Sequence, residues 1–117
     1  MKNYAVEKSI ELALLIIEYC EQLEKNRKFV ISNQLLKAGT SVGANIHEAQ
    51  NAESKADFIH KIKIATKELE EIKYWLILCK KSSSYPDDNL QLTEKTKELG
   101  LILYKILSTS IKSIKNG

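Results

Sequence analysis

Residues that break helices are scarce in this sequence, which has one proline, Pro86, and four glycines among its 117 residues. Proline and glycine are the strongest signals for turns. Their scarcity therefore favours long helices over a fold built from many short strands. Long apolar runs are also missing. No run is longer than Leu12–Ile17, which is too short for a signal-peptide core or a membrane span, so we expect a cytoplasmic protein with no membrane partner.

Cysteine, histidine and arginine are rare as well. Cys20 and Cys79 lie far apart at apolar helical positions, which predicts two buried free thiols in a reducing compartment. His47 and His60 lie off the apolar stripes of their segments, which predicts exposed side chains. Arg27 is the single arginine. Because arginine normally provides the bidentate contacts to phosphate and guanine, sequence-specific DNA recognition is disfavoured.

Catalytic motifs are absent from the sequence, which has no nucleophile elbow, phosphate-binding loop or dinucleotide fingerprint. The glycine-containing stretch 39–43 has no strand before it and lies inside a helical pattern. We therefore predict no catalytic residues, no cofactor, no metal site, no small-molecule substrate and no enzymatic activity. A metal-dependent enzyme that uses His47, His60 and nearby carboxylates is an alternative, but it lacks the ligand spacing that such sites need.

Apolar residues at alternating steps of three and four mark four helical segments, at about residues 5–26, 33–52, 54–81 and 89–115. Ser32 and Ser54 are the expected N-caps of the second and third segments. Short connections make consecutive helices antiparallel neighbours. The predicted fold is all-α, an up-and-down antiparallel four-helix bundle that spans residues 1–117 as a single domain.

Each segment has an apolar stripe that predicts its core-facing side. In the first segment the predicted stripe is Val6, Ile10, Ala13, Ile17 and Cys20, widened by Leu12, Leu15, Ile16, Tyr19 and Leu23. In the second it is Leu35, Gly39, Val42, Ile46 and Ala49. In the third it is Phe58, Ile62, Ala65, Leu69, Ile72, Leu76 and Cys79, and in the fourth Leu92, Leu99, Leu103 and Ile106.

The second segment carries another stripe beside the first, made of small and polar residues: Ala38, Ser41, Asn45, Glu48 and Ala52. Gly39 and Gly43 each cost about 1 kcal/mol of helix propensity relative to alanine. A helix that keeps both is expected to let another backbone approach closely. Asn45 predicts a structural hydrogen bond that fixes helix register, with a functional contact as the alternative.

Lysines are the main candidates for binding. The chain has a formal net charge of +3, which permits a polyanionic partner without requiring one. Five lysines of the third segment fall within about one third of the helix circumference, interrupted only by Glu70. They are Lys55, Lys63, Lys67, Lys73 and Lys81. This arrangement is either an ordinary solvated face or a weak, sequence-tolerant nucleic-acid-binding surface.

Residues 34–49, QLLKAGTSVGANIHEA, and 53–61, ESKADFIHK, closely resemble a bacterial four-helix-bundle family. That family is also called the 23S ribosomal RNA intervening-sequence protein family, and the likeness is densest from residue 35 to about 75. Some members are encoded inside insertions in large-subunit ribosomal RNA genes. A related branch, the accessory proteins of diversity-generating retroelements, forms five-membered rings whose basic surfaces engage a reverse transcriptase and nucleic acid.

The resemblance implies a non-enzymatic homo-oligomeric scaffold, most simply a homopentamer, with RNA or an RNA-handling protein as its partner. The first two segments each carry two adjacent stripes, more than one bundle core needs, and this also favours self-association. The resemblance makes Gly39, Ser41, Gly43, Asn45 and Glu48 a structural motif. Family members often carry an arginine after this motif, whereas residues 49–52 have none. The alternative function is therefore a protein-interaction module that does not bind nucleic acid.

Overall fold

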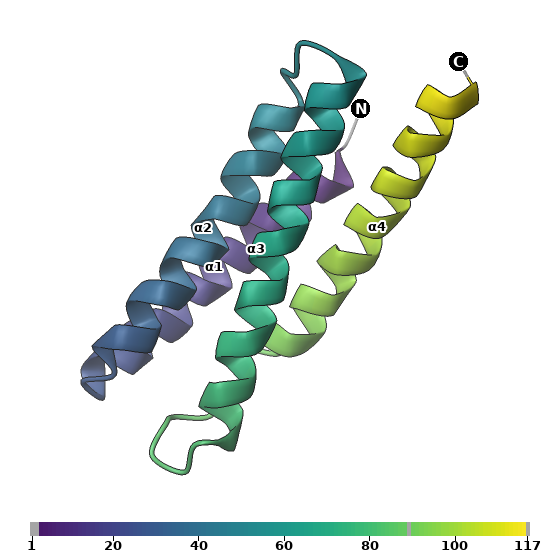
Figure 1. The fold of residues 1–117 in the computed structure, drawn as a ribbon. Helices are drawn as coiled ribbons and strands as arrows, with labels where there is room; N and C mark the ends of the chain where they lie inside the picture. Colours follow the sequence, from purple (N-terminus) through teal and green to yellow (C-terminus); the bar gives the residue numbers. More distant parts are fainter. Residues whose placement is uncertain (1–2, 89, 117) are drawn as a thin grey trace.

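The computed structural model describes residues 3–88 and 90–116, and these form four long helices (Figure 1). The helices are α1, Tyr4–Lys25; α2, Phe29–Ala49; α3, Lys55–Lys81; and α4, Leu92–Asn116. No strand occurs within the described ranges. The predicted all-α fold, an up-and-down four-helix bundle, is confirmed. None of the described helices is long and apolar enough to cross a membrane.

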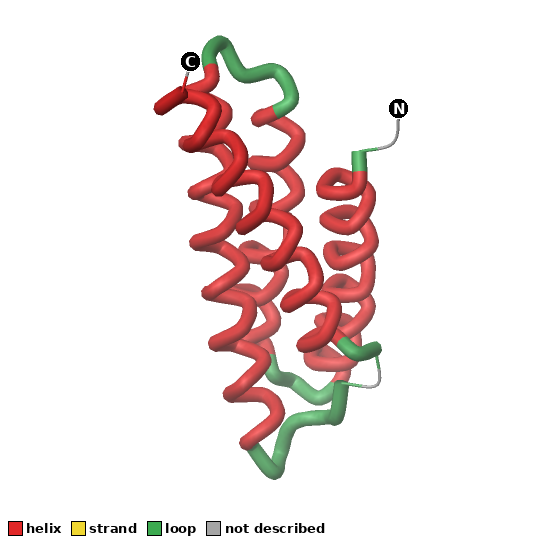
Figure 2. The backbone as a smooth tube through the Cα atoms, turned by 90° about the vertical axis from the view of Figure 1, so that its right-hand side faces the viewer, coloured by secondary structure: helices red, strands yellow, loops and turns green. Residues whose placement is uncertain are grey.

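Each helix packs against two others. α1 contacts α2 and α4, and α3 contacts the same two helices from the opposite corner of the bundle. Figure 2 shows the α1–α2 and α3–α4 connections at one end, with the α2–α3 connection and the two chain termini at the other. This closed arrangement leaves an outward face on every helix.

The predicted core stripes of α2 and α3 are confirmed. The α2 stripe from Leu35 to Ala49 is buried throughout, and in α3 only Phe58 is partly exposed. α4 buries Leu92, Leu99 and Leu103, while Ile106 is half-buried. Cys20 and Cys79 are buried free thiols, also as predicted.

The predicted core stripe of α1 is wrong. Ile10 and Ile17 are 45% and 38% exposed, and of the five predicted residues only Cys20 is buried. The residues expected merely to widen that stripe form the core side, namely Leu12, Ile16, Tyr19 and Leu23, together with Ala5 and Ser9. α1 has two apolar faces of similar strength, so periodicity alone could not decide which one turns inward.

The predicted start of α2 is also wrong, because the helix begins at Phe29 and Ser32 is a buried residue in its first turn. α1 ends in a Schellman motif, in which Lys28 N–H donates to Leu23 O and Arg27 N–H donates to Glu24 O. Arg27 occupies the left-handed position of this motif, with a φ of 62°, where glycine is usual. The chain therefore reverses within three residues.

Ser32 joins α1 to α2 instead of capping a helix. Its hydroxyl donates to Cys20 O at 3.3 Å, and the Cys20 thiol donates back to Ser32 O at 3.4 Å. α2 also ends at Ala49, three residues before the predicted limit. By contrast, Ser54 caps α3 as predicted, because its side chain accepts a hydrogen bond from Asp57 N–H.

The carboxylate of Asp88 fixes the beginning of α4. It accepts hydrogen bonds from Leu90 N–H at 2.8 Å and from Leu92 N–H at 2.7 Å. The helix begins at Leu92, and the predicted first residue, Asn89, lies outside the described residues. Backbone N–H groups at the start of a helix have no acceptor within the helix, and the Asp88 carboxylate supplies one.

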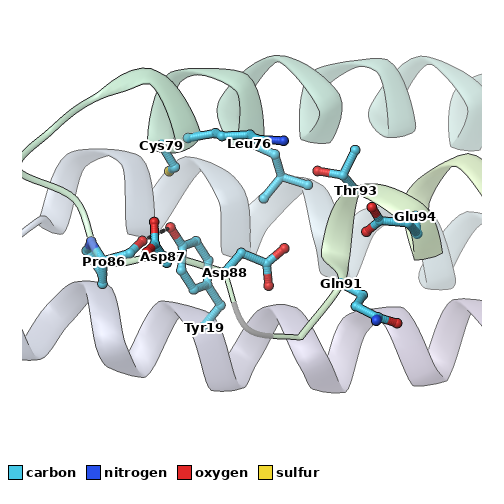
Figure 3. Close-up of a pocket in the computed structure, with 10 residues that line it drawn as sticks. Tyr19, Leu76, Cys79, Pro86, Asp87, Asp88, Gln91, Thr93 and Glu94 are labelled. Carbon is cyan, nitrogen blue, oxygen red and sulfur yellow. Dashed lines mark hydrogen bonds between the residues drawn. The ribbon is translucent and has the colours of Figure 1, made fainter.

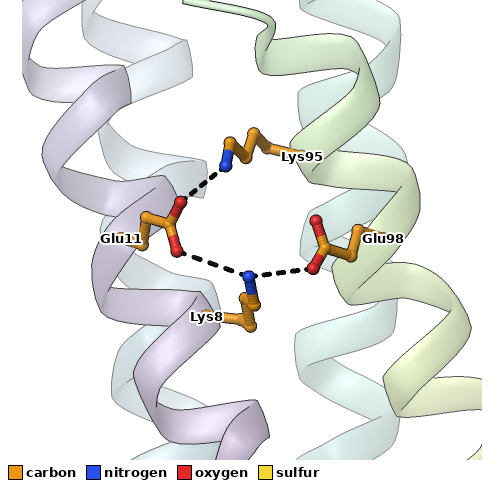
Figure 4. Close-up of polar contacts among 4 residues, drawn as sticks. All are labelled: Lys8, Glu11, Lys95 and Glu98. Atoms are coloured by element: carbon orange, nitrogen blue, oxygen red, sulfur yellow. Dashed lines mark hydrogen bonds and ion pairs between the residues drawn. The ribbon is translucent and has the colours of Figure 1, made fainter.

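Four charged side chains link α1 to α4 (Figure 4). Lys95 Nζ lies 2.7 Å from Glu11, and Lys8 Nζ lies 2.9 Å from Glu98 and 3.6 Å from Glu11. The hydrogen bond with Lys95 lowers the pKa of Glu11, and the hydrogen bond with Glu98 raises the pKa of Lys8. Both shifts favour the charged forms of Glu11 and Lys8, and with two lysines and two glutamates the network has a formal charge of zero.

Candidate nucleic-acid interface

The five predicted binding lysines lie on one side of α3, and we call this side the lysine face. Lys55, Lys63, Lys67 and Lys81 are exposed, while Lys73 is half-buried near α4. α3 runs unbroken from Lys55 to Lys81, so a single rigid helix sets the spacing of these charges. The face therefore offers a line of positive charge along most of the bundle.

Two of the five lysines are held by neighbouring side chains. Lys73 Nζ forms an ion pair with Glu70 at 2.9 Å, and Lys55 Nζ donates to Ser113 Oγ at 2.7 Å. An exposed ion pair of this kind contributes only about 0–1 kcal/mol. A phosphate can compete with it, but the charge of Lys73 is partly offset in the free protein.

The other three lysines, Lys63, Lys67 and Lys81, have no carboxylate within 4 Å among the residues that the structure describes. Lysine acts as a mobile point charge that neutralises phosphate without reading bases. The three residues are therefore the members of the lysine face best placed to bind a polyanion.

Two exposed apolar side chains on the lysine face were missed by the sequence analysis. Tyr74 is 54% exposed and Ile77 is 51% exposed. Tyr74 lies seven residues after Lys67 and seven before Lys81, so heptad spacing could have placed it on this face. Its ring packs edge-on against Trp75, with centroids 5.2 Å apart. Exposed aromatic rings among lysines are a common feature of single-stranded nucleic-acid surfaces.

Three of the five motif residues, Gly39, Gly43 and Glu48, lie where α2 contacts another helix. An added Cβ on Gly39 would lie 2.8 Å from Ile16 Cδ1 of α1, and one on Gly43 would lie 3.6 Å from Ser9 Oγ. Gly39 therefore admits a side chain of α1, whereas the space at Gly43 is less tight. On the side of α2 that faces α3, Glu48 pairs with Lys61 at 3.6 Å.

The other two motif residues, Ser41 and Asn45, interact with each other. Asn45 Nδ2 donates to Ser41 O at 2.9 Å, one turn earlier in the same helix. The Asn45 side chain thus makes a structural hydrogen bond, as predicted, but the bond lies within α2. It therefore cannot fix the register between two helices, and that part of the prediction is wrong.

Both histidines are exposed, as predicted. His47 Nδ1 lies 3.1 Å from Gly43 O within its own helix. Its neighbour Glu48 faces Lys61. Among the described residues, no three His, Cys, Asp or Glu side chains lie close enough together to hold a metal ion.

A cavity of about 370 Å³ lies beside the α3–α4 connection (Figure 3). Tyr19 closes its inner side and donates its hydroxyl to Pro86 O at 2.8 Å. Cys79 and the acidic residues Asp87, Asp88 and Glu94 also line it. Asp88 is already engaged in capping α4, and burial raises the pKa of both Tyr19 and Cys79. Because nucleophilic attack requires the thiolate, this environment does not activate Cys79.

We expect both thiols to resist alkylation in the folded protein, since burial also raises the pKa of Cys20. Treatment with iodoacetamide at pH 8 should leave native chains largely unlabelled over a period that labels both cysteines completely in urea. Mass spectrometry would measure the labelling. Rapid modification of native Cys79 would contradict this expectation and would show an open path from the cavity to its sulfur.

Comparisons with known proteins place the chain in a family. The family model described as 23S rRNA-intervening sequence protein matches residues 1–105. A crystal structure from Bacteroides thetaiotaomicron VPI-5482, described as a protein with unknown function from the S23 ribosomal protein family, is 38% identical with a TM-score of 0.83. The match covers 88% of this chain and 97% of that one. No curated protein matches. The chain therefore belongs to the 23S rRNA-intervening sequence protein family.

Proposed function

We propose that this protein is a non-enzymatic, cytoplasmic, homo-oligomeric scaffold that associates with RNA or with an RNA-handling partner. The observation that carries the proposal is the lysine face of α3, where Lys63, Lys67 and Lys81 are exposed around Tyr74. The family name, which refers to an intervening sequence of 23S rRNA, agrees with an RNA partner. The buried free thiols agree with a reducing compartment.

The binding would be electrostatic and tolerant of sequence. Lysines neutralise phosphates and release counterions, so affinity falls as salt concentration rises. Tyr74 would add stacking on unpaired bases without selecting among them. An oligomer would repeat the lysine face around its symmetry axis and raise the apparent affinity through effective concentration. A ring of five copies, as the family resemblance implies, would present five such faces.

We expect the double substitution Lys63→Glu with Lys67→Glu to weaken binding to structured RNA by at least about tenfold at low salt, because two phosphate contacts become repulsive. The slope of log affinity against log salt should become shallower by about 1 to 2. Fluorescence anisotropy with a labelled RNA at about 50 and 200 mM salt would measure both quantities.

The matched control is Lys25→Glu with Lys37→Glu, which changes the net charge equally at exposed positions on α1 and α2. This control should retain most of the affinity. Equal losses in both variants would show that only total charge matters and that the lysine face is not the site.

The alternative function is a protein-interaction module without nucleic-acid binding. Large exposed apolar side chains favour it, including Tyr74, Ile77, Leu101 and Tyr104. The modest net charge of +3 also favours it. If the parent protein fails to bind RNA even at low salt, this alternative replaces the RNA-associated scaffold.

A further inference from the structure

α1 and α4 each carry exposed apolar side chains on an outward face. On α1 these are Ile10, Leu14 and Ile17, with Leu14 61% exposed. On α4 they are Leu101 and Tyr104, both 72% exposed. Apolar side chains gathered on one face and rimmed by charges often mark an interaction site.

The charged residues beside these two stripes have opposite signs. Glu7, Glu18 and Glu21 each lie one turn from an apolar residue of the α1 stripe, and all three are exposed. We call the stripe and these glutamates the acidic α1 face. Lys97 and Lys105 lie one turn before and one turn after Leu101. With Leu101 and Tyr104 they form the basic α4 face.

The charge difference extends over both helices. The network of Lys8, Glu11, Lys95 and Glu98 is neutral and joins α1 to α4 inside one bundle. When these four residues are left out, α1 has four glutamates and one lysine, and α4 has four lysines and one glutamate. The remaining formal charges are therefore −3 on α1 and +3 on α4, so the two outward faces complement each other.

We propose that the acidic α1 face of one copy binds the basic α4 face of a second copy. This inference rests on the homo-oligomer in the proposed function and identifies the contact that would build it. A contact between two α1 faces would place glutamates opposite glutamates, and a contact between two α4 faces would place lysines opposite lysines. Such like-charge contacts are strongly unfavourable. Charge therefore selects contact between unlike faces.

A contact between unlike faces has a consequence for assembly. It leaves the second face of each copy free to bind another copy, so the contacts form a ring where the rotation between copies closes and an open filament where it does not. In a closed ring every copy is held on two sides. The lysine face of α3 includes neither of these two surfaces, so it would stay available to RNA in the assembled protein.

Charge reversal tests the pairing. Lys97→Glu with Lys105→Glu gives the basic α4 face the same sign as its proposed partner, and Glu18→Lys with Glu21→Lys does the same to the acidic α1 face. Each double variant should weaken self-association by about 100-fold, because like charges meet across the contact. Light scattering coupled to size exclusion should then show the 13.3 kDa chain at concentrations where the parent assembles.

Combining all four substitutions in one chain restores complementarity and should restore the parent's particle mass.

The matched control is Lys63→Glu with Lys67→Glu on α3, which changes the net charge as much as the α4 reversal does and should leave the particle mass unchanged. Circular dichroism would check helicity. If a reversal variant unfolds, Leu14→Ser and Leu101→Ser provide a second test, because each removes an exposed apolar contact and should also reduce the particle mass.

Each outcome has a distinct meaning. A monomeric parent at micromolar concentrations would overturn both this contact and the homo-oligomeric part of the proposed function. A parent that assembles while folded reversal variants assemble equally well would overturn this contact alone. Dissociation of both double variants without recovery in the folded quadruple variant would overturn the pairing of α1 with α4.

Discussion

Replacing Ile16 with alanine is expected to lower the free energy of unfolding by about 2–5 kcal/mol. Ile16 is fully buried on the core side of α1, and its side chain lies directly over Gly39 of α2. The substitution removes apolar contacts and leaves a cavity that the neighbouring helices can close only in part. Urea unfolding followed by circular dichroism would measure the loss.

Ile10 provides the matched control on the same helix. It is 45% exposed, so Ile10→Ala should lower the free energy of unfolding by less than about 1 kcal/mol. Both variants and the parent should be compared at one low protein concentration, because self-association adds to apparent stability. Losses of similar size at the two positions would contradict the observed orientation of α1 and favour the stripe predicted from the sequence.

Alanine substitutions at the two α2 glycines should have opposite effects on stability. Gly39→Ala is expected to lower the free energy of unfolding by about 1–3 kcal/mol, because the new methyl group would press against the enclosed side chain of Ile16. Gly43→Ala is expected to raise it by up to about 1 kcal/mol, because the added Cβ fits and alanine favours a helix. Thermal unfolding of both variants would show whether each substitution raises or lowers stability.

A second substitution separates steric pressure from other effects at Gly39. Ile16→Val removes Cδ1, the atom that would lie 2.8 Å from the new Cβ. The double variant of Gly39→Ala and Ile16→Val should therefore be more stable than the sum of the two single losses predicts. If the effects simply add, or if both glycine substitutions change stability in the same direction, close approach at Gly39 is not the cause.

The architecture was predictable because the strongest patterns agree with one another. The α3 stripe has seven apolar positions from Phe58 to Cys79 without an interruption, and Ser54 marks the start of the helix. In α2, the stripe from Leu35 to Ala49 has a less apolar neighbour, so only one side of the helix could supply the core. Where a single face dominates, periodicity is sufficient.

The errors arose where local sequence was ambiguous. α1 has apolar residues on both sides, and only packing against α2 and α4 determines which side is buried. The start of α2 was misplaced because Arg27 takes the left-handed position where the expected signal is glycine. Ser32 has the composition of a cap but hydrogen bonds to Cys20 across the helix pair.

The candidate site was predictable as a line of charge but not in its detailed contacts. Helical spacing placed the five lysines on one side of α3. The partner of Lys55 is Ser113, which lies 58 residues away in sequence, so only the fold brings the two together. The heptad spacing of Tyr74 from Lys67 and Lys81 assigns it to the same face, but a charge pattern gives no signal for an aromatic ring.

The packing of Tyr74 against Trp75 makes the protein's own fluorescence informative. Trp75 is the only tryptophan in the chain, so its emission arises from one known position. Its ring lies edge-on to a tyrosine of the lysine face, at a centroid distance of 5.2 Å. A nucleobase that displaces or covers Tyr74 would change the surroundings of the indole directly. The unmodified chain thus carries its own optical probe beside the lysine face, and titrations there need no attached dye.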